Sequence, residues 1–189
     1  MTVTPADLDR MARALASGDS APLDAHLASL GMEKTRYVWS PTPADLPEPR
    51  LVTLLGYWSE LRGNDGLPKL DAVDPLRLGE ALGYAMLLEA LPDGDFRYRL
   101  YGSRIADRAG FDMTGKRTSE IPSHPAMSTL FGVVYRAASA RRTPIFTRHT
   151  PPAPIDVTRW SRLVLPIQGA EGRIDFLVGN VPGERRGQD

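Results

Sequence analysis

Cysteine is absent from the 189-residue chain. The sequence therefore excludes disulfides, cysteine nucleophiles, thiolate-bound zinc, iron–sulfur clusters and photosensors that work through a cysteine adduct. Net charge is absent as well, because 23 Lys and Arg side chains balance 23 Asp and Glu side chains. Nonspecific binding to DNA or RNA depends on a positive excess, so this balance argues against a nucleic-acid partner.

Long hydrophobic runs are also missing. No apolar run approaches the roughly 18 residues that cross a bilayer, so we expect no membrane partner. Residues 1–10 carry Asp7 and Asp9 and lack the basic stretch and apolar stretch of a secretory signal, which predicts a cytoplasmic protein. The content of 42% hydrophobic and 24% charged residues is typical of a globular chain.

Proline divides the chain into regions. Four prolines fall within residues 40–50, and such a composition favours an extended polyproline conformation over a helix. We interpret this stretch as a Pro-rich linker between an N-terminal helical extension, residues 1–39, and a domain of residues 51–182. Residues 183–189 are expected to form a disordered tail.

Two amphipathic helices are predicted inside the domain. The first ends at Gly63 and carries a stripe at helical spacing formed by Leu51, Leu54, Leu55, Trp58 and Leu61. Packing on its own domain is the preferred interpretation of that stripe, and docking to a partner is the alternative. The second helix covers residues 126–142, and its apolar face consists of Met127, Leu130, Phe131, Val134 and Tyr135.

A β-hairpin is predicted in the middle of the chain. Residues 83–91 and 95–102 are apolar or alternating, and the sequence Pro-Asp-Gly between them indicates a turn. Because side chains alternate across a strand, matching the apolar faces places Glu89 opposite Arg97 and near Arg99. The outer face would hold Arg97, Arg99 and Tyr101, and the inner face would hold Met86, Leu88, Ala90, Phe96, Tyr98 and Leu100.

The order of the elements predicts an α+β fold. Three more strands are expected at residues 144–150, 156–167 and 173–182. Two strands joined by a hairpin, then helices, then three strands indicate one five-stranded antiparallel sheet with helices on one face.

Three groups of short motifs occur in a familiar order. They are Tyr57-Trp58 with Leu61-Arg62-Gly63, Leu67-Pro68 and Asp74-Pro75; then Phe96–Leu100 with Gly102, Ile105, Gly110 and Thr114-Gly115; and last Leu163–Ile167. Over residues 50–182 these motifs resemble the PAS domain family, in particular a single-PAS bacterial subfamily known mostly from alphaproteobacteria. The resemblance implies the strand order 2-1-5-4-3, helices around a small cavity, and sensing or protein interaction without catalysis.

One segment resembles part of a nucleotide-binding loop. Residues 110–116 fit the first seven positions of a P-loop. That motif requires Ser or Thr next, to hold magnesium, and a buried strand before it, whereas residue 117 is arginine and residues 104–109 have a polar, helical pattern. We interpret the segment as a turn whose two glycines supply positive φ. A P-loop nucleotide-binding enzyme is the weak alternative.

Neither a metal nor a cofactor is predicted. The three histidines, His26, His124 and His149, have no second histidine three or four residues away, so their spacing supports no metal site. Surface or loop positions are expected for all three. Haem-binding PAS domains use a histidine in the general region of His124 as axial ligand, so haem stays open, as does flavin.

Six arginines suggest a second kind of site. The following could clamp an anionic ligand: Arg97, Arg99, Arg104, Arg108, Arg159 and Arg162. The preferred interpretation instead pairs arginines with the nearby acids Glu89, Asp107 and Asp112.

We expect a sensory or regulatory module of bacterial signalling that binds a small ligand or a signalling protein. The ligand pocket should lie under the second helix and be lined by Met86, Leu88, Phe96, Tyr98, Met127, Phe131 and Trp160. Tyr98 and Trp160 are the expected polar anchors, because each joins a hydrogen-bond donor to a large apolar body. A purely structural dimerisation module without a ligand is the alternative.

We also expect a homodimer. The first and last strands of the domain have apolar residues on both faces, so something must cover the outer face of the sheet. The predicted interface combines that face with the first helix, through Leu51, Leu54, Leu55, Trp58 and Leu61. Folding back of the extension, residues 1–31, over the same face is the alternative.

Overall fold

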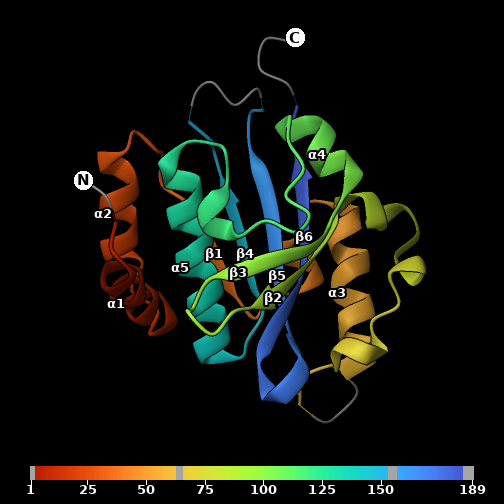
Figure 1. Cartoon of the computed structure of the whole chain (residues 1–189). Coiled ribbons are helices and arrows are strands. Elements are labelled where there is room, and N and C mark those ends of the chain that lie inside the picture. The colour runs from red at the N-terminus through yellow and green to blue at the C-terminus, as the bar shows by residue number, and fades with distance from the viewer. Residues whose placement is uncertain (1–2, 63–65, 153–156, 185–189) are drawn as a thin grey trace.

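The centre of the molecule is one antiparallel sheet with the strand order β1-β4-β5-β6-β2-β3. The computed structural model in Figure 1 describes residues 3–62, 66–152 and 157–184. The strands are β1 Arg36–Trp39, β2 Ala85–Ala90, β3 Phe96–Tyr101, β4 Ile145–His149, β5 Trp160–Gln168 and β6 Ile174–Pro182. The five predicted strands occur in the predicted order, as β3-β2-β6-β5-β4. The prediction of five strands is nevertheless wrong, because β1 from the N-terminal extension pairs with β4 as a sixth.

The helices flank this sheet. The α-helices are α1 Pro5–Ala16, α2 Ala21–Ser29, α3 Pro49–Arg62, α4 Ser103–Ala109 and α5 Pro125–Arg141. The short 3-10 helices are η1 Pro43–Asp45, η2 Leu70–Ala72, η3 Pro75–Tyr84, η4 Thr118–Glu120 and η5 Ala170–Gly172. Among the described residues, none of the helices is long and apolar enough to cross a membrane.

Helices cover both faces of the sheet rather than one. Figure 1 shows α5 on one face, with α1 and α2 packed against it, and α3 on the opposite face. Two separate hydrophobic clusters result, because β5 sends Val164 toward α5 and its neighbours Leu163 and Leu165 toward α3. The prediction of one covered face is therefore corrected, since the apolar residues on both sides of the strands each meet a helix of the same chain.

The helix α3 approaches the sheet at a glycine. A Cβ atom added to Gly179 of β6 would lie 2.5 Å from a methyl carbon of Leu51 and 2.7 Å from one of Leu54. The missing side chain therefore lets α3 sit directly on the strand. On the same helix, the indole nitrogen of Trp58 donates a hydrogen bond of 2.8 Å to the carbonyl oxygen of Pro166.

This packing changes the expected dimer interface. Leu51, Leu54, Leu55 and Trp58 are at most 7% exposed, covered by their own sheet, and Leu61 is half-buried. These four buried side chains have no surface left for a second copy. Homodimerisation stays a prediction, on surface other than this stripe. Gly63, the predicted end of the helix, lies outside the described residues.

The predicted hairpin register is confirmed near its turn. Glu89 lies opposite Arg97. One carboxylate oxygen of Glu89 lies 3.4 Å from a guanidinium nitrogen of Arg99, and the other lies 3.3 Å from a guanidinium nitrogen of Arg173. Arg99 is exposed, so the contact adds little to stability.

A β-bulge corrects the register farther from the turn. Leu87 pairs with Leu100, but the next residue, Leu88, pairs two positions earlier on β3. Arg99 is therefore an extra residue, which reverses the alternation of the side chains beyond it. Tyr101 turns toward the α5 face, although we predicted it on the outer face, and Leu100 pairs with a residue that packs under α3.

The N-terminal extension is part of the same packed structure. Met11 and Leu15 of α1 are buried in the cluster under α5, and β1 completes the sheet, so the extension is not purely helical. In the Pro-rich stretch, Leu46 is only 6% exposed and packs with the α3 cluster. Residues 40–50 thus pack on the domain.

Two residues beyond β6 are hydrogen-bonded to the segment before β5. The backbone nitrogen of Thr158 donates to the carbonyl oxygen of Glu184 at 2.9 Å, and that of Gly183 donates to Arg159 at 2.8 Å. Residues 183 and 184, predicted as the start of a disordered tail, are therefore held in place. Residues 185–189 lie outside the described part, as does residue 156, where the strand before β6 was expected to begin.

Candidate functional site

A cavity of about 40 Å³ lies between α5 and the sheet. Aromatic side chains dominate its lining: Tyr98, Tyr101, Phe111, Phe131 and Trp160. Polar atoms come from Ser123, Arg162 and Asn180. An apolar wall with a few polar groups is typical of a small-molecule site. The volume is small, with room for about three water molecules at roughly 10–15 Å³ each.

The predicted pocket residues separate into two groups. Tyr98, Met127, Phe131 and Trp160 line the cavity. Met86, Leu88 and Phe96 do not; they are at most 3% exposed and belong to the surrounding hydrophobic cluster. Ligand binding by the first group stays a prediction.

Arg162 is the polar centre of the cavity. It lies on β5, opposite Asn180 of β6, and is 2% exposed. Its guanidinium donates a hydrogen bond to the hydroxyl of Tyr135, and its central carbon lies 3.9 Å from the ring centroid of Phe131. Its Nε atom has no hydrogen-bond partner among the described residues. None of the carboxylates in the described ranges forms an ion pair with Arg162.

The charge of Arg162 has no anionic counterpart among these contacts. Burial opposes that charge, but the hydroxyls of Tyr135 and Tyr98 outweigh burial, and the pKa of Arg162 is raised. Burial raises the pKa of Tyr135 well above its usual range, so its phenol is neutral. The guanidinium is therefore a buried positive charge held by a neutral hydroxyl and an aromatic ring.

His149 lies next to this charge. It is 2% exposed on β4, and its ring centroid lies 5.8 Å from that of Phe131. Neither ring nitrogen has a hydrogen-bond partner in the described ranges of the chain. Burial, and then the charge of Arg162, lowers the pKa of His149 to about 3, so the imidazole is neutral near pH 7. The expected surface or loop position is wrong for this histidine, because the strand turns it under α5.

The other two histidines take ordinary roles. Nδ1 of His124 accepts a hydrogen bond of 3.3 Å from the backbone of Ala126 and so caps α5. His26 is half-buried on α2. Across the described residues, no group of three or more His, Asp or Glu side chains could hold a metal ion. Haem or flavin would require large rearrangements of a cavity of about 40 Å³.

One wall of the cavity comes from the connection between α4 and α5, residues 110–124. Phe111, Ile121 and Ser123 of this connection line the cavity and are half-buried. Gly110 and Gly115 have φ of 82° and 80°, as the turn interpretation predicted. Because helix α4, not a strand, precedes Gly110, the structural context of a P-loop is missing.

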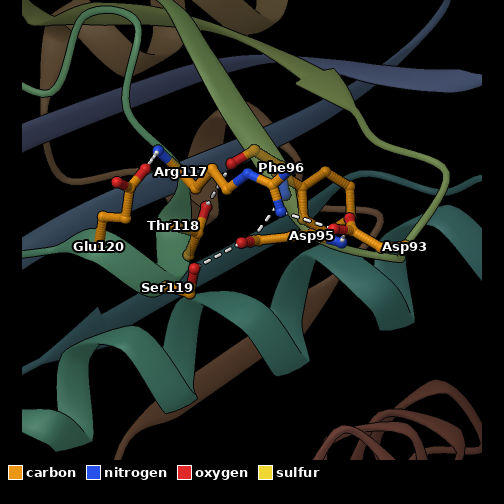
Figure 2. A network of polar contacts seen from close by, with 7 residues as sticks. All are labelled: Asp93, Asp95, Phe96, Arg117, Thr118, Ser119 and Glu120. Carbon is orange, nitrogen blue, oxygen red and sulfur yellow. Dashed lines mark hydrogen bonds and ion pairs between the residues drawn. The ribbon is translucent and has the colours of Figure 1, made fainter.

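A polar network fastens this connection to the β2–β3 turn (Figure 2). A guanidinium nitrogen of Arg117 lies 2.5 Å from a carboxylate oxygen of Asp93, and the hydroxyl of Ser119 donates to Asp95 at 2.6 Å. The hydrogen bond from Arg117 lowers the pKa of Asp93. These contacts are exposed, so they position the wall more than they stabilise the fold.

Sequence reasoning missed several residues of the cavity. Tyr101 was placed on the wrong face because a bulge leaves no pattern in the sequence. Arg162 was identified only as one of six arginines that could clamp an anion. A stronger signal was available, since Arg162 alternates with Trp160 and Val164 and is the charged residue of their face. Of the predicted arginine pairs, Glu89 with Arg99 is confirmed. Asp107 and Asp112 form no ion pair with described residues.

Comparisons with known proteins identify the family of the domain. A family model described as a PAS domain matches residues 47–181. This range contains α3, α4, α5, strands β2 to β5, all of β6 except Pro182, and every residue that lines the cavity. Neither the curated proteins nor the solved structures gave a match.

Proposed function

The chain belongs to the PAS domain family, and from this premise we propose that it is a cytoplasmic sensory module that takes a small molecule into the cavity under α5. Family membership supports a sensory or regulatory role in signalling, without a catalytic step. One observation carries the proposal of a ligand: the cavity contains a buried arginine without a described counter-charge. A core selected only for stability would gain from an apolar side chain there.

The predicted residues have distinct parts in this proposal. Tyr98, Met127, Phe131 and Trp160 would contact the ligand, because they line the cavity. Met86, Leu88 and Phe96 would support that lining from the hydrophobic cluster. A ligand larger than a few waters requires residues 110–124 to move outward. That movement would change the outer surface of the domain, where a signalling protein could detect it.

Native mass spectrometry of the full chain tests the ligand. We expect a retained mass above the 20.7 kDa of the chain that is lost on denaturation. Ile121→Trp should remove it, because the larger side chain fills the cavity from its half-buried wall. Val52→Trp is the matched control, since Val52 is a half-buried residue of α3 and does not line the cavity. A bare chain for the wild type would contradict the proposal.

A dimerisation module without ligand is the second candidate. The small volume of the cavity favours it, because about 40 Å³ is close to a filled core. Sedimentation equilibrium distinguishes the two candidates when combined with the mass measurement. A dimer of the 20.7 kDa chain that retains no ligand supports the structural module, whereas a species with retained ligand supports the sensor.

A further inference from the structure

The surroundings of Arg162 are incomplete as a site for a positive charge. A guanidinium presents five N–H donors in a planar fork and is best satisfied by a carboxylate or a similar anion. Among the described residues it contacts the neutral hydroxyl and ring of Tyr135 and the ring of Phe131, and its buried Nε is unpaired. Charges are rarely buried without a partner, because removing one from water is costly.

A second unpaired polar group points into the same space. Asn180 pairs with Arg162 in the β5–β6 register, lines the cavity and is 5% exposed. Within the part of the chain that the structure describes, its side-chain oxygen has no hydrogen-bond partner. Two buried side chains on adjacent strands therefore each carry one polar atom without a partner among the described residues, and both side chains line the cavity. An acceptor on a bound molecule would satisfy Nε of Arg162, whereas the oxygen of Asn180 requires a donor on the same molecule or an ordered water.

The remaining lining determines what kind of anion fits. Arg162 is the one cationic side chain among the described residues that line the cavity, which suits one negative charge rather than the two of a phosphate. The fork of a guanidinium matches the two oxygens of a carboxylate. Tyr98, Tyr101, Phe111 and Trp160 surround the rest of the space and favour an apolar or aromatic body.

We propose that the ligand of this cavity is a small organic monocarboxylate with an apolar or aromatic body, and that Arg162 binds its carboxylate. The inference rests on the proposed function, because it assigns the chemical class of the ligand that the sensory module takes up. Arg162 is then the residue that selects the ligand, and the aromatic side chains contact its body.

Paired probes test the charge of the ligand directly. Isothermal titration calorimetry at one fixed salt concentration compares benzoate with benzamide, phenylacetate with phenylacetamide, and butyrate with butyramide. Within at least one pair, we expect the acid to bind at least tenfold more tightly than the uncharged amide of nearly the same shape. Any ligand retained from expression should be an anion in the mass spectrum of the released compound.

Two substitutions assign the effect to Arg162. Arg162→Met should lower the affinity for the acid at least tenfold and leave that for the amide unchanged. Arg148→Met on the neighbouring strand β4 is the matched control, because Arg148 is half-buried and does not line the cavity, so it should bind the acid normally. Circular dichroism checks that both variants fold. The comparison of acid with amide on the wild type stands even if Arg162→Met does not fold.

Each other result has a defined meaning. An amide that binds as tightly as its acid in every pair, or a neutral retained compound, overturns the anionic ligand and leaves the proposed function intact. An unchanged acid affinity in Arg162→Met overturns the role of Arg162. If no probe binds and no mass is retained, both the inference and the proposed function fail.

Discussion

The two faces of the sheet are built for different purposes. The α3 face is packed mainly with leucines against β5 and β6, and its largest ring, Trp58, has its indole nitrogen satisfied. The α5 face buries Arg162 and His149 with unpaired nitrogen atoms and contains the aromatic cavity. The α3 face is thus packed as a stable hydrophobic core, whereas the α5 face contains unpaired buried polar groups around the cavity.

Because the two faces differ, residues that stabilise the fold and residues of the candidate site alternate along one strand. Along β5, Leu163 and Leu165 point to α3, whereas Arg162 points to the cavity. Substitutions on alternate residues of one strand should therefore have different consequences. Protein cores retain buried polar groups at a cost to stability, and that cost is expected where a ligand is bound.

The largest expected effect is on the α3 face. Leu54→Ala should lower the free energy of unfolding by about 3 kcal/mol, because it removes a fully buried side chain and leaves a cavity against Gly179. Urea denaturation measures the loss. Native mass spectrometry should show ligand retention unchanged, and loss of the ligand in folded Leu54→Ala would contradict the separation of the two faces.

His149 gives the α5 face a pH dependence. Its folded-state pKa of about 3 is below the usual 6.5, so below pH 6.5 the unfolded chain binds a proton that the folded chain does not. Stability therefore falls as the pH falls from about 6.5 toward 3. His149→Leu should remove this loss, and its advantage over the wild type should grow by about 2 kcal/mol between pH 6.5 and 5. Urea denaturation at each pH measures both proteins. A constant difference in the free energy of unfolding between His149→Leu and the wild type across this pH range would refute the expectation.

Arg162→Met should have the opposite pattern of effects from Leu54→Ala, with ligand binding lost and stability retained. Replacing a buried charge by an apolar side chain is often neutral or stabilising, so we expect the free energy of unfolding without ligand to rise by about 1 kcal/mol. Thermal and urea denaturation measure the change. A loss of more than about 2 kcal/mol would show that Arg162 is retained for stability, and the contrast between the faces would fail.

The smallest effect is expected away from the cavity, at Asp175. This residue is 1% exposed and accepts a hydrogen bond of 2.8 Å from the backbone nitrogen of Ala90. Burial raises its pKa, so the folded chain holds the proton more tightly and stability falls as the pH rises through the raised value. Asp175→Asn keeps an acceptor oxygen and should be slightly more stable than the wild type at pH 7. That difference should vanish near pH 3 in paired denaturation curves.

The features that depend on the alternation of side chains along a strand and on the order of the elements could be predicted from the sequence. The hairpin register near the turn followed from matching the apolar faces, which placed Glu89 opposite Arg97, and the order of the five domain strands followed from the family resemblance. Apolar residues on both sides of the strands correctly indicated that both faces are covered. What covers the second face did not follow, because a leucine stripe does not identify its partner. Gly179 was the local sign that a helix of this chain packs there.

The buried positions of the polar residues of the candidate site could not be predicted from local sequence patterns. The burial of His149 and Arg162 arises because α5 packs over strands that are distant from it in sequence. The position of Tyr101 depends on the bulge at Arg99, a single extra residue with no compositional mark. The apolar half, such as Met127 and Phe131, was accessible because helical spacing alone marks the buried side of α5.

The pairing of β1 with β4 means that the unit that folds is larger than the matched domain. The family match begins at residue 47, after β1 has already covered the outer edge of β4. A chain shortened to the match would present β4, with four of its five residues buried in the intact protein, as an uncapped edge. Exposed apolar edges recruit strands from other molecules. The extension thus protects the edge of β4 from pairing with strands of other molecules. Shortened chains should aggregate and precipitate under conditions in which the full chain stays in solution.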